Sequence, residues 1–202
     1  MDHILVFGVP IFRYHLDPTE LRRIAEEKFR LDLPINGNPD GWDCELKTDF
    51  PNSLENTYTP FYDDIMAQFS KDLKLEDSVA MIHESWLNYY VKGMNQEEHD
   101  HTPSFYSGIH FIKFNPEVHS SPMFMNPLAQ LYSMSYENRS DIDVHEFSKQ
   151  QLSLDNISEG DIILFPSFIR HRVLKQETDE VRITSSFNIN TIKGSARRVF
   201  CP

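Results

Sequence analysis

The chain has 202 residues with a formal net charge of −12, and 40% of its residues are hydrophobic and 12% aromatic. A chain of this length and composition is expected to fold as a single domain, residues 1–202, around a sizeable core. The acidic balance argues against general nucleic-acid binding, because phosphate contacts need clustered lysines and arginines. It still allows a small anion to be bound by one or two arginines.

The cysteines and the N-terminus favour an intracellular protein. Cys44 and Cys201 are too few and too isolated for a disulfide framework or a zinc knuckle. The first residues, Met-Asp-His-Ile-Leu-Val-Phe-Gly, lack the basic start of a secretory signal. No stretch approaches the roughly eighteen apolar residues that a membrane span needs. We therefore expect a cytoplasmic protein that does not bind membranes.

The N-terminal segment begins with a strand pattern and continues with a helix pattern. Residues 4–16 are rich in Ile, Val, Phe and Tyr, which predicts one or two strands broken at Pro10. The motif Asp17-Pro18-Thr19-Glu20 is typical of a helix start, in which Asp17 caps the helix and Glu20 reaches back to the cap. Apolar residues at helical spacing then predict a helix over 18–30.

The next segment predicts a loop and a second helix. Residues 32–57 are rich in Pro, Asn, Gly, Asp and Ser, which indicates a long loop. Apolar residues at helical spacing predict a helix over 60–74. We expect residues 1–78 to support the remainder of the domain, residues 79–202.

From residue 79 the pattern changes to short runs of β-branched and aromatic residues separated by turn residues. These runs predict strands over 79–92, 106–115, 122–126, 130–136, 161–166, 171–175 and 181–191. The polar residues 137–158 carry little pattern and are expected to form a loop across the mouth of the sandwich. Two helices followed by about eight strands predict a mainly β fold, a jelly roll with the N-terminal helices packed on one sheet.

Three histidines form a candidate metal site. His99 and His101 flank Asp100, and in an extended segment alternate side chains share a face. The two imidazoles can therefore point into one cavity while Asp100 points away. His171 follows the apolar run 161–166, which would deliver it from the core. Imidazole ligands suit iron, zinc, copper or nickel, although two surface histidines and one core histidine would give the same pattern.

Arg182 and its neighbours form a candidate site for an acidic cosubstrate. Arg182, Thr184 and Ser186 alternate onto one face of the strand 181–191. A guanidinium with a hydroxyl two residues away matches a carboxylate, and a buried arginine needs an anion of this kind. An exposed arginine in a surface salt bridge is the alternative.

A second polar pair lies on the strand 79–92. Asn88 and Tyr90 share one face with Trp86. Polar groups inside a β-sandwich need hydrogen-bond partners. Asn88 and Tyr90 therefore either contact the cosubstrate or satisfy backbone groups.

Taken together, these segments resemble the Fe(II)- and 2-oxoglutarate-dependent oxygenases of the prolyl-hydroxylase kind. In Tyr90-Val-Lys-Gly93-Met-Asn-Gln-Glu-Glu-His99-Asp-His101 the Tyr, the Gly and the first His stand at the offsets found in that family. The segment Gly160-Asp-Ile-Ile-Leu-Phe-Pro-Ser, followed by His171 and Arg182-Ile-Thr184, resembles its second half. The chain is closer still to a small branch that carries Trp-x-Asn, His-x-His, Ser-Gly and Phe-Pro-Ser-x-x-x-His. The similarity covers residues 79–191.

The resemblance implies a double-stranded β-helix of the cupin-like kind, with Fe(II) and 2-oxoglutarate as cofactors. In that family the distal histidine, here His171, binds iron, and the arginine, here Arg182, holds the far carboxylate of 2-oxoglutarate. Thr184, Tyr90, Asn88 and Ser186 would complete the cosubstrate site.

The chain departs from the family pattern at position 101, where a carboxylate ligand is usual and this sequence has His101. A triad of three histidines would leave the Fe(II) site one unit more positive. Asp100 could serve as a ligand only if the segment twists out of extended geometry. A bound water in place of the third ligand, or a loss of activity, are further alternatives.

The sequence therefore predicts a 2-oxoglutarate-dependent dioxygenase that hydroxylates an unidentified substrate. One alternative is a cupin-like metal dioxygenase without 2-oxoglutarate, which three histidines favour and Arg182 disfavours. Another is a catalytically silent jelly-roll binding protein. The prime substrate could be a protein residue or a small molecule, and the loops 32–57 and 137–158 would contact it.

Overall fold

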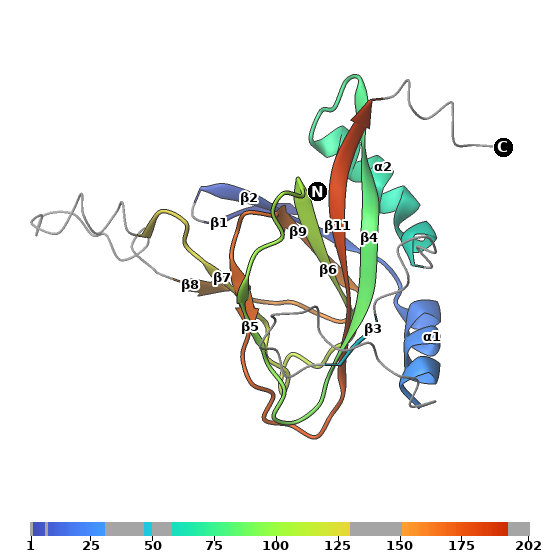
Figure 1. Ribbon diagram of the computed structural model, residues 1–202, viewed down its shortest axis with the longest axis vertical. Helices are drawn as coiled ribbons and strands as arrows, with labels where there is room; N and C mark the ends of the chain where they lie inside the picture. The colour runs from blue at the N-terminus through green and yellow to red at the C-terminus, as the bar shows by residue number, and fades with distance from the viewer. Residues whose placement is uncertain (1, 7, 31–46, 50–57, 130–150, 194–202) are drawn as a thin grey trace, which may run out of the picture.

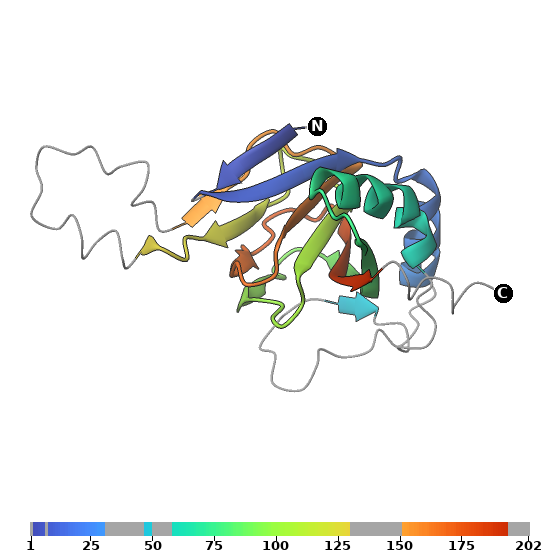
Figure 2. The same cartoon turned by 90° about the horizontal axis from the view of Figure 1, so that it is seen from above.

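The computed structural model of the protein describes residues 2–6, 8–30, 47–49, 58–129 and 151–193 (Figure 1). In this part of the chain, two antiparallel sheets form a sandwich and two helices lie outside it (Figure 2). The predicted strand 130–136 lies outside the described residues, as do Cys44, Cys201 and most of the predicted loops 32–57 and 137–158. None of the described helices is long and apolar enough to cross a membrane.

The larger sheet has seven strands in the order β1-β2-β9-β6-β11-β4-β3. Its strands are β1 Asp2–Val6, β2 Val9–His15, β3 Lys47–Asp49, β4 Ser78–Tyr90, β6 Tyr106–Lys113, β9 Asp161–Pro166 and β11 Arg182–Lys193. The smaller sheet has four strands in the order β5-β10-β7-β8. Its strands are β5 Gln96–His99, β7 Pro122–Met125, β8 Gln151–Ser153 and β10 His171–Val173.

The first predicted strand region forms a hairpin, but the break predicted at Pro10 is wrong. The chain turns at Gly8, whose φ of 78° favours glycine, and Pro10 lies inside β2 opposite Leu5. The residues of β2 that pair with β9 start only at Phe12. The missing N–H of Pro10 therefore interrupts no bond on that side of the strand.

The first helix, α1, runs over Thr19–Arg30, close to the predicted range. The Asp17 side chain accepts hydrogen bonds from the backbone N–H and the hydroxyl of Thr19, so its capping role is confirmed. The prediction that Glu20 reaches back to the cap is wrong. Its carboxylate instead pairs with Arg23 at 2.8 Å, because a charged partner one turn away competes for it.

The second helix begins with a 3₁₀ turn, Thr59–Tyr62, and continues as α2, Asp63–Asp72. Both helices lie over the outer face of the larger sheet (Figure 2). Their side chains pack against the residues of this face. This cluster includes Leu21, Ala25, Met66 and Phe69 from the helices and Leu87, Tyr89, Ile183 and Phe187 from the strands.

A second apolar cluster fills the space between the two sheets. It includes Ile109, Phe111, Ile163 and Phe165 from the larger sheet and Phe124 from the smaller one. Because successive strand residues face opposite sides, Ile183 and Phe187 of β11 face the helices, while Arg182 and Thr184 face the interior of the sandwich. The candidate site residues of β11 therefore lie between the sheets.

Three short strands differ from the sequence-based expectation. β3 lies within the predicted loop 32–57, β8 lies within the predicted loop 137–158, and β5 was not predicted. β3 and β8 have three residues each, too few for a period-2 pattern to be visible. β5, Gln-Glu-Glu-His, is polar and becomes a strand by pairing with β10.

Candidate metal centre

Three histidines come together between the sheets. His99 ends β5 and lies opposite His171, the first residue of β10, and His101 follows two residues after His99. One ligand nitrogen from each lies within 4.8 Å of the others. The ring centroids are 4.9 Å apart for His99 and His101, 4.3 Å for His99 and His171, and 5.2 Å for His101 and His171. The structure thus brings together all three histidines singled out from the sequence.

The neighbouring carboxylate, Asp100, points away from this cluster. Its side chain is exposed and accepts hydrogen bonds from the backbone N–H of Thr102 at 3.0 Å and from the Thr102 hydroxyl at 2.7 Å. Asp100 is not part of the group of possible ligand atoms. The twist that would make Asp100 a ligand is therefore absent from this segment.

Aromatic side chains surround the histidines. The His171 ring lies 4.8 Å from the Phe165 ring and 5.9 Å from the Phe124 ring, measured between centroids. The Trp86 ring lies 5.7 Å from the His101 ring. These ring contacts restrict the orientations of the His101 and His171 imidazoles.

Backbone carbonyl groups lie beside two of the rings. His99 Nδ1 is 2.8 Å from the Glu97 carbonyl oxygen, and His171 Nδ1 is 3.3 Å from the Ile169 carbonyl oxygen. A carbonyl oxygen accepts, so these bonds favour the tautomer with the proton on Nδ1. In that tautomer Nε2 is the basic nitrogen that can bind a metal.

Burial keeps the three imidazoles neutral. It lowers the pKa of His101 to about 3 and lowers the pKa of His99. It also lowers the pKa of His171, well below the ordinary value. Neutral imidazole is the form that coordinates metals, so at neutral pH the cluster needs no deprotonation before a cation enters.

Arg182 is the first residue of β11 and lies opposite Tyr90 of β4, on the face of the larger sheet that points into the sandwich. It is 1% exposed, and its guanidinium carbon lies 4.4 Å from the centre of the Tyr90 ring, with Phe111 at 5.8 Å and Phe114 at 5.9 Å. Its Nε and Nη1 atoms make no hydrogen bond to the described residues, and no described carboxylate forms an ion pair with it. Burial lowers its pKa, yet a guanidinium stays charged at neutral pH.

The other predicted cosubstrate residues lie along the same two strands. Thr184 is buried opposite Asn88. The Asn88 amide donates to the Ser186 hydroxyl at 2.9 Å, and its oxygen accepts from Thr48 at 3.4 Å. The sheet thus uses part of the hydrogen-bonding capacity of Asn88 and Ser186, while placing both on the inward face with Arg182.

Tyr90, another predicted cosubstrate residue, contacts two polar side chains of the protein. Its hydroxyl donates to the side-chain oxygen of Gln96 at 2.9 Å, and its ring lies under the Arg182 guanidinium. Gln96, Phe111 and Phe114 were not singled out from the sequence. Phe111 could have been found, because it shares the inward face of β6 with Ile109, whereas the contacts of Gln96 depend on folding.

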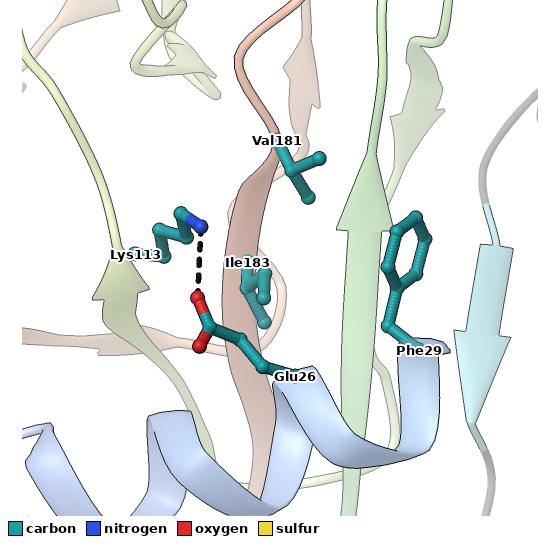
Figure 3. Close-up of a pocket in the computed structure, with 5 residues that line it drawn as sticks. All are labelled: Glu26, Phe29, Lys113, Val181 and Ile183. Atoms are coloured by element: carbon teal, nitrogen blue, oxygen red, sulfur yellow. Dashed lines mark hydrogen bonds and ion pairs between the residues drawn. The ribbon is translucent and has the colours of Figure 1, made fainter. Parts of the chain in front are cut away.

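A separate hollow lies on the opposite face of the larger sheet. Figure 3 shows it between α1 and the strands β6 and β11, lined by Glu26, Phe29, Lys113, Val181 and Ile183. The Lys113 ammonium and the Glu26 carboxylate form an ion pair across it at 2.8 Å. Ile183 faces the helices and Arg182 faces the sandwich interior, so the sheet separates this hollow from the histidines.

The family comparison agrees with this geometry. The model of the family described as "Putative 2OG-Fe(II) oxygenase" matches residues 84–188, just over half of the chain, including the three histidines and Arg182. The chain belongs to this family. The oxygenase therefore has Fe(II) and 2-oxoglutarate as its expected cofactors, and the resemblance inferred from the sequence motifs is confirmed.

Solved structures show the same fold at low sequence identity. A Pseudomonas putida prolyl-4-hydroxylase matches with a TM-score of 0.58 and 13% identity, over 89% of this chain and 91% of that chain. EctD from S. alaskensis, in its apoform, matches with a TM-score of 0.62 and 14% identity, over 90% of this chain and 73% of that chain. These matches confirm the jelly-roll prediction.

A third similar structure, HygX from Streptomyces hygroscopicus, holds nickel and 2-oxoglutarate. It matches with a TM-score of 0.53 and 10% identity, over 90% of this chain and 83% of that chain. A comparison with curated protein sequences gives no match.

Proposed function

We propose that this oxygenase is a hydroxylase in which His99, His101 and His171 hold Fe(II) and Arg182 anchors 2-oxoglutarate. Membership of the family implies Fe(II) and 2-oxoglutarate as the cofactors. The observation that carries the residue assignment is the buried Arg182 guanidinium, for which the described residues provide no carboxylate. A buried charge without an anion is costly, and the distal carboxylate of 2-oxoglutarate would remove that cost.

The histidine cluster fits a divalent metal. The three rings are neutral, held by carbonyl groups or aromatic rings, and close enough for one cation to bind a nitrogen from each. A set without a carboxylate leaves the bound Fe(II) one unit more positive than the usual set of two histidines and one carboxylate. That extra positive charge favours an anionic cosubstrate.

When bound, iron and 2-oxoglutarate supply the oxidative chemistry that decarboxylates 2-oxoglutarate and hydroxylates a C–H bond. The protein binds and orients the reactants. Arg182, whose Nε and Nη1 donors have no partner among the described residues, would hold the distal carboxylate, and the hydroxyl of Thr184, two residues along the same face, would donate a further bond. Tyr90 holds the guanidinium plane in place, and Gln96 in turn fixes the Tyr90 hydroxyl.

The alternatives predict different behaviour. A cupin-like dioxygenase would use the same three histidines without 2-oxoglutarate, which leaves Arg182 unexplained. A catalytically silent jelly roll would keep its fold without metal.

The cytoplasmic location stays a prediction, supported by the two isolated cysteines.

Metal analysis followed by 2-oxoglutarate titration and a succinate-release assay tests the proposal. We expect one divalent metal per chain, cosubstrate binding that needs the metal, and succinate formed only with Fe(II), 2-oxoglutarate and oxygen. A protein that binds metal but not 2-oxoglutarate would support the cupin-like dioxygenase. An intact fold that binds neither would support the silent jelly roll.

A further inference from the structure

The strands that carry the cosubstrate site continue past the histidines. In Figure 1, β4 and β11 extend far beyond the short strands of the smaller sheet. Along this extension Trp86 lies opposite Ser186, and Glu84 lies opposite Asn188 two residues further from Arg182. Side chains two residues apart share a face, so Glu84 and Asn188 continue the inward face beyond the metal cluster. Glu84 is exposed at this end of the face, whereas Asn188 opposite it is buried.

A row of hydrogen bonds holds Glu84 in place. The Asn188 amide donates to Glu84 Oε2 at 2.8 Å, and the Ser107 hydroxyl donates to the Asn188 oxygen at 2.9 Å. The hydroxyls of Ser107 and Ser167 lie 2.7 Å apart, and the Ser167 carbonyl accepts from the backbone N–H of His101 at 2.9 Å. The carboxylate is therefore fixed relative to the segment that carries His101.

The other members of this row are buried. Asn188 is 6% exposed, Ser107 is 1% and Ser167 is 0%. Glu84 is the member that reaches solvent, and among the described residues no lysine or arginine forms an ion pair with it. A fixed carboxylate without a described cation is suited to bind a positively charged group from outside.

The neighbouring ring adds a second attraction for a cation. Trp86 lies on the same face as Glu84 and next to His101, with ring centroids 5.7 Å apart. Indole rings attract ammonium and guanidinium groups through the ring quadrupole. Trp86 is only 4% exposed, so a cationic side chain would meet Glu84 first, at the surface, and would reach the Trp86 ring only at the inner end of the subsite.

The surface around this opening is partly apolar. Met81 is 41% exposed, Phe105 is 43% and Phe168 is 52%. The Phe105 carbonyl accepts from the N–H of Ser167, and Phe168 follows Ser167, so both phenylalanines flank the buried row. An open face with exposed apolar side chains fits a polypeptide segment better than a small amine, which would need an enclosed cavity.

We propose that Glu84, oriented by Asn188, and Trp86 form a substrate subsite for a lysine or arginine side chain of a polypeptide. The claim that the bound segment is the prime substrate rests on the proposed function. The claim that the subsite binds a cation is independent of that function. The net charge of −12 favours a basic partner at long range.

The first test titrates n-butylammonium chloride into the ¹⁵N-labelled full chain, with and without zinc(II), and follows the indole N–H of Trp86 by NMR. The chain has two tryptophans, so a Trp42→Phe variant assigns the signal. We expect a saturable shift, with a dissociation constant at least fivefold weaker in Glu84→Gln. Glu117→Gln, an exposed glutamate after β6, is the matched control and should bind like the wild type. The neutral analogue n-butanol should give no saturable shift.

Equal affinity in Glu84→Gln, or an equal response to n-butanol, would overturn the cation subsite. A second comparison uses Gly-Gly-Lys-Gly-Gly, its norleucine analogue and free L-lysine. We expect the lysine peptide to bind more tightly than both others, whereas tighter binding of free L-lysine would overturn the polypeptide assignment. These shifts need neither iron nor 2-oxoglutarate. If the cation does not bind, the succinate-release assay can therefore still succeed. If no succinate is released, the cation can still bind.

Discussion

The guanidinium carbon of Arg182 lies 4.4 Å from the centre of the Tyr90 ring, and the strands β11 and β4 pair these two residues directly. The ring stabilises the positive charge but accepts no hydrogen bond from Nε or Nη1. Tyr90 therefore keeps the arginine in position while leaving two donors for a ligand.

Replacing Arg182 with Ala should weaken 2-oxoglutarate binding at least tenfold and leave metal content unchanged. Loss of one partner of a buried charge-assisted pair typically costs roughly 2–5 kcal/mol. Calorimetric titration under anaerobic conditions measures the affinity. Arg22→Ala, which loses only an ion pair with Glu159 on the outer side of the sheet, is the control. Unchanged affinity in Arg182→Ala would place the anchor elsewhere.

Replacing His171 with Ala should abolish metal binding and leave the fold largely intact. His171 is 2% exposed and sits between the other two histidines and the aromatic rings. Metal content by elemental analysis and folding by circular dichroism measure the two effects. The exposed His83, replaced with Ala, should leave metal content at the wild-type level. Full metal content in His171→Ala would refute the three-histidine centre.

The histidine pair and the arginine could be predicted from the sequence because their arrangement is local. Alternation in an extended segment puts His99 and His101 on one side and Asp100 on the other, and the structure has this arrangement. The same alternation places Arg182 and Thr184 on one face of β11. In any extended segment, alternate side chains point to the same side, so this part of the arrangement does not depend on the rest of the fold.

The parts that sequence reasoning missed depend on which strands become neighbours. Glu84 and Asn188 are far apart in the chain and meet only because β4 pairs with β11 in one particular register. Gln96 reaches Tyr90 only because β5 folds back against β10. Register is set by long-range packing and turns, so no local pattern in the sequence shows these contacts.

Stability should fall in acid partly through His110, which lies away from the histidine cluster on the helix side of the larger sheet. Its Nδ1 is 3.1 Å from the Tyr62 hydroxyl, and burial lowers its pKa to about 4. Above pH 6.5 it is neutral in both the folded and unfolded states. Between pH 6.5 and about 4 only the unfolded chain takes up the proton, so the free energy of unfolding decreases as pH falls, by up to roughly 3 kcal/mol.

Urea denaturation at pH 7 and pH 4.5 measures this effect. The loss of stability between the two values should be smaller in His110→Gln than in the wild type, because glutamine keeps a hydrogen bond to Tyr62 but does not titrate. The other buried histidines contribute equally to both proteins and cancel in the comparison. An identical loss in both proteins would show that His110 is not responsible.

Gly108 should not tolerate a side chain. It lies opposite Phe187, and an added Cβ would lie 2.2 Å from Phe187 Cε2, 2.4 Å from Cζ and 2.8 Å from Leu164 Cδ2. Gly108→Ala should therefore lower the free energy of unfolding by roughly 1–3 kcal/mol, as measured by chemical denaturation. Adding Phe187→Leu should recover part of the loss, whereas additive losses would mean that the added methyl group does not meet the ring.

His101 stands where the resemblance to the oxygenase family implies a carboxylate ligand. His101→Asp should still bind metal, because a carboxylate and an imidazole can each occupy one position on Fe(II). His101→Ala should weaken metal binding, because it removes one of the three ligands. The neighbouring Trp86 ring, which contacts His101, cannot replace that ligand. Asp100→Ala should have little effect, because its carboxylate is exposed and bonded to Thr102. Metal affinity by competition with a chelator ranks the three variants. Loss of iron in Asp100→Ala together with its retention in His101→Ala would show that the segment bends on binding metal and that the centre is of the ordinary carboxylate kind.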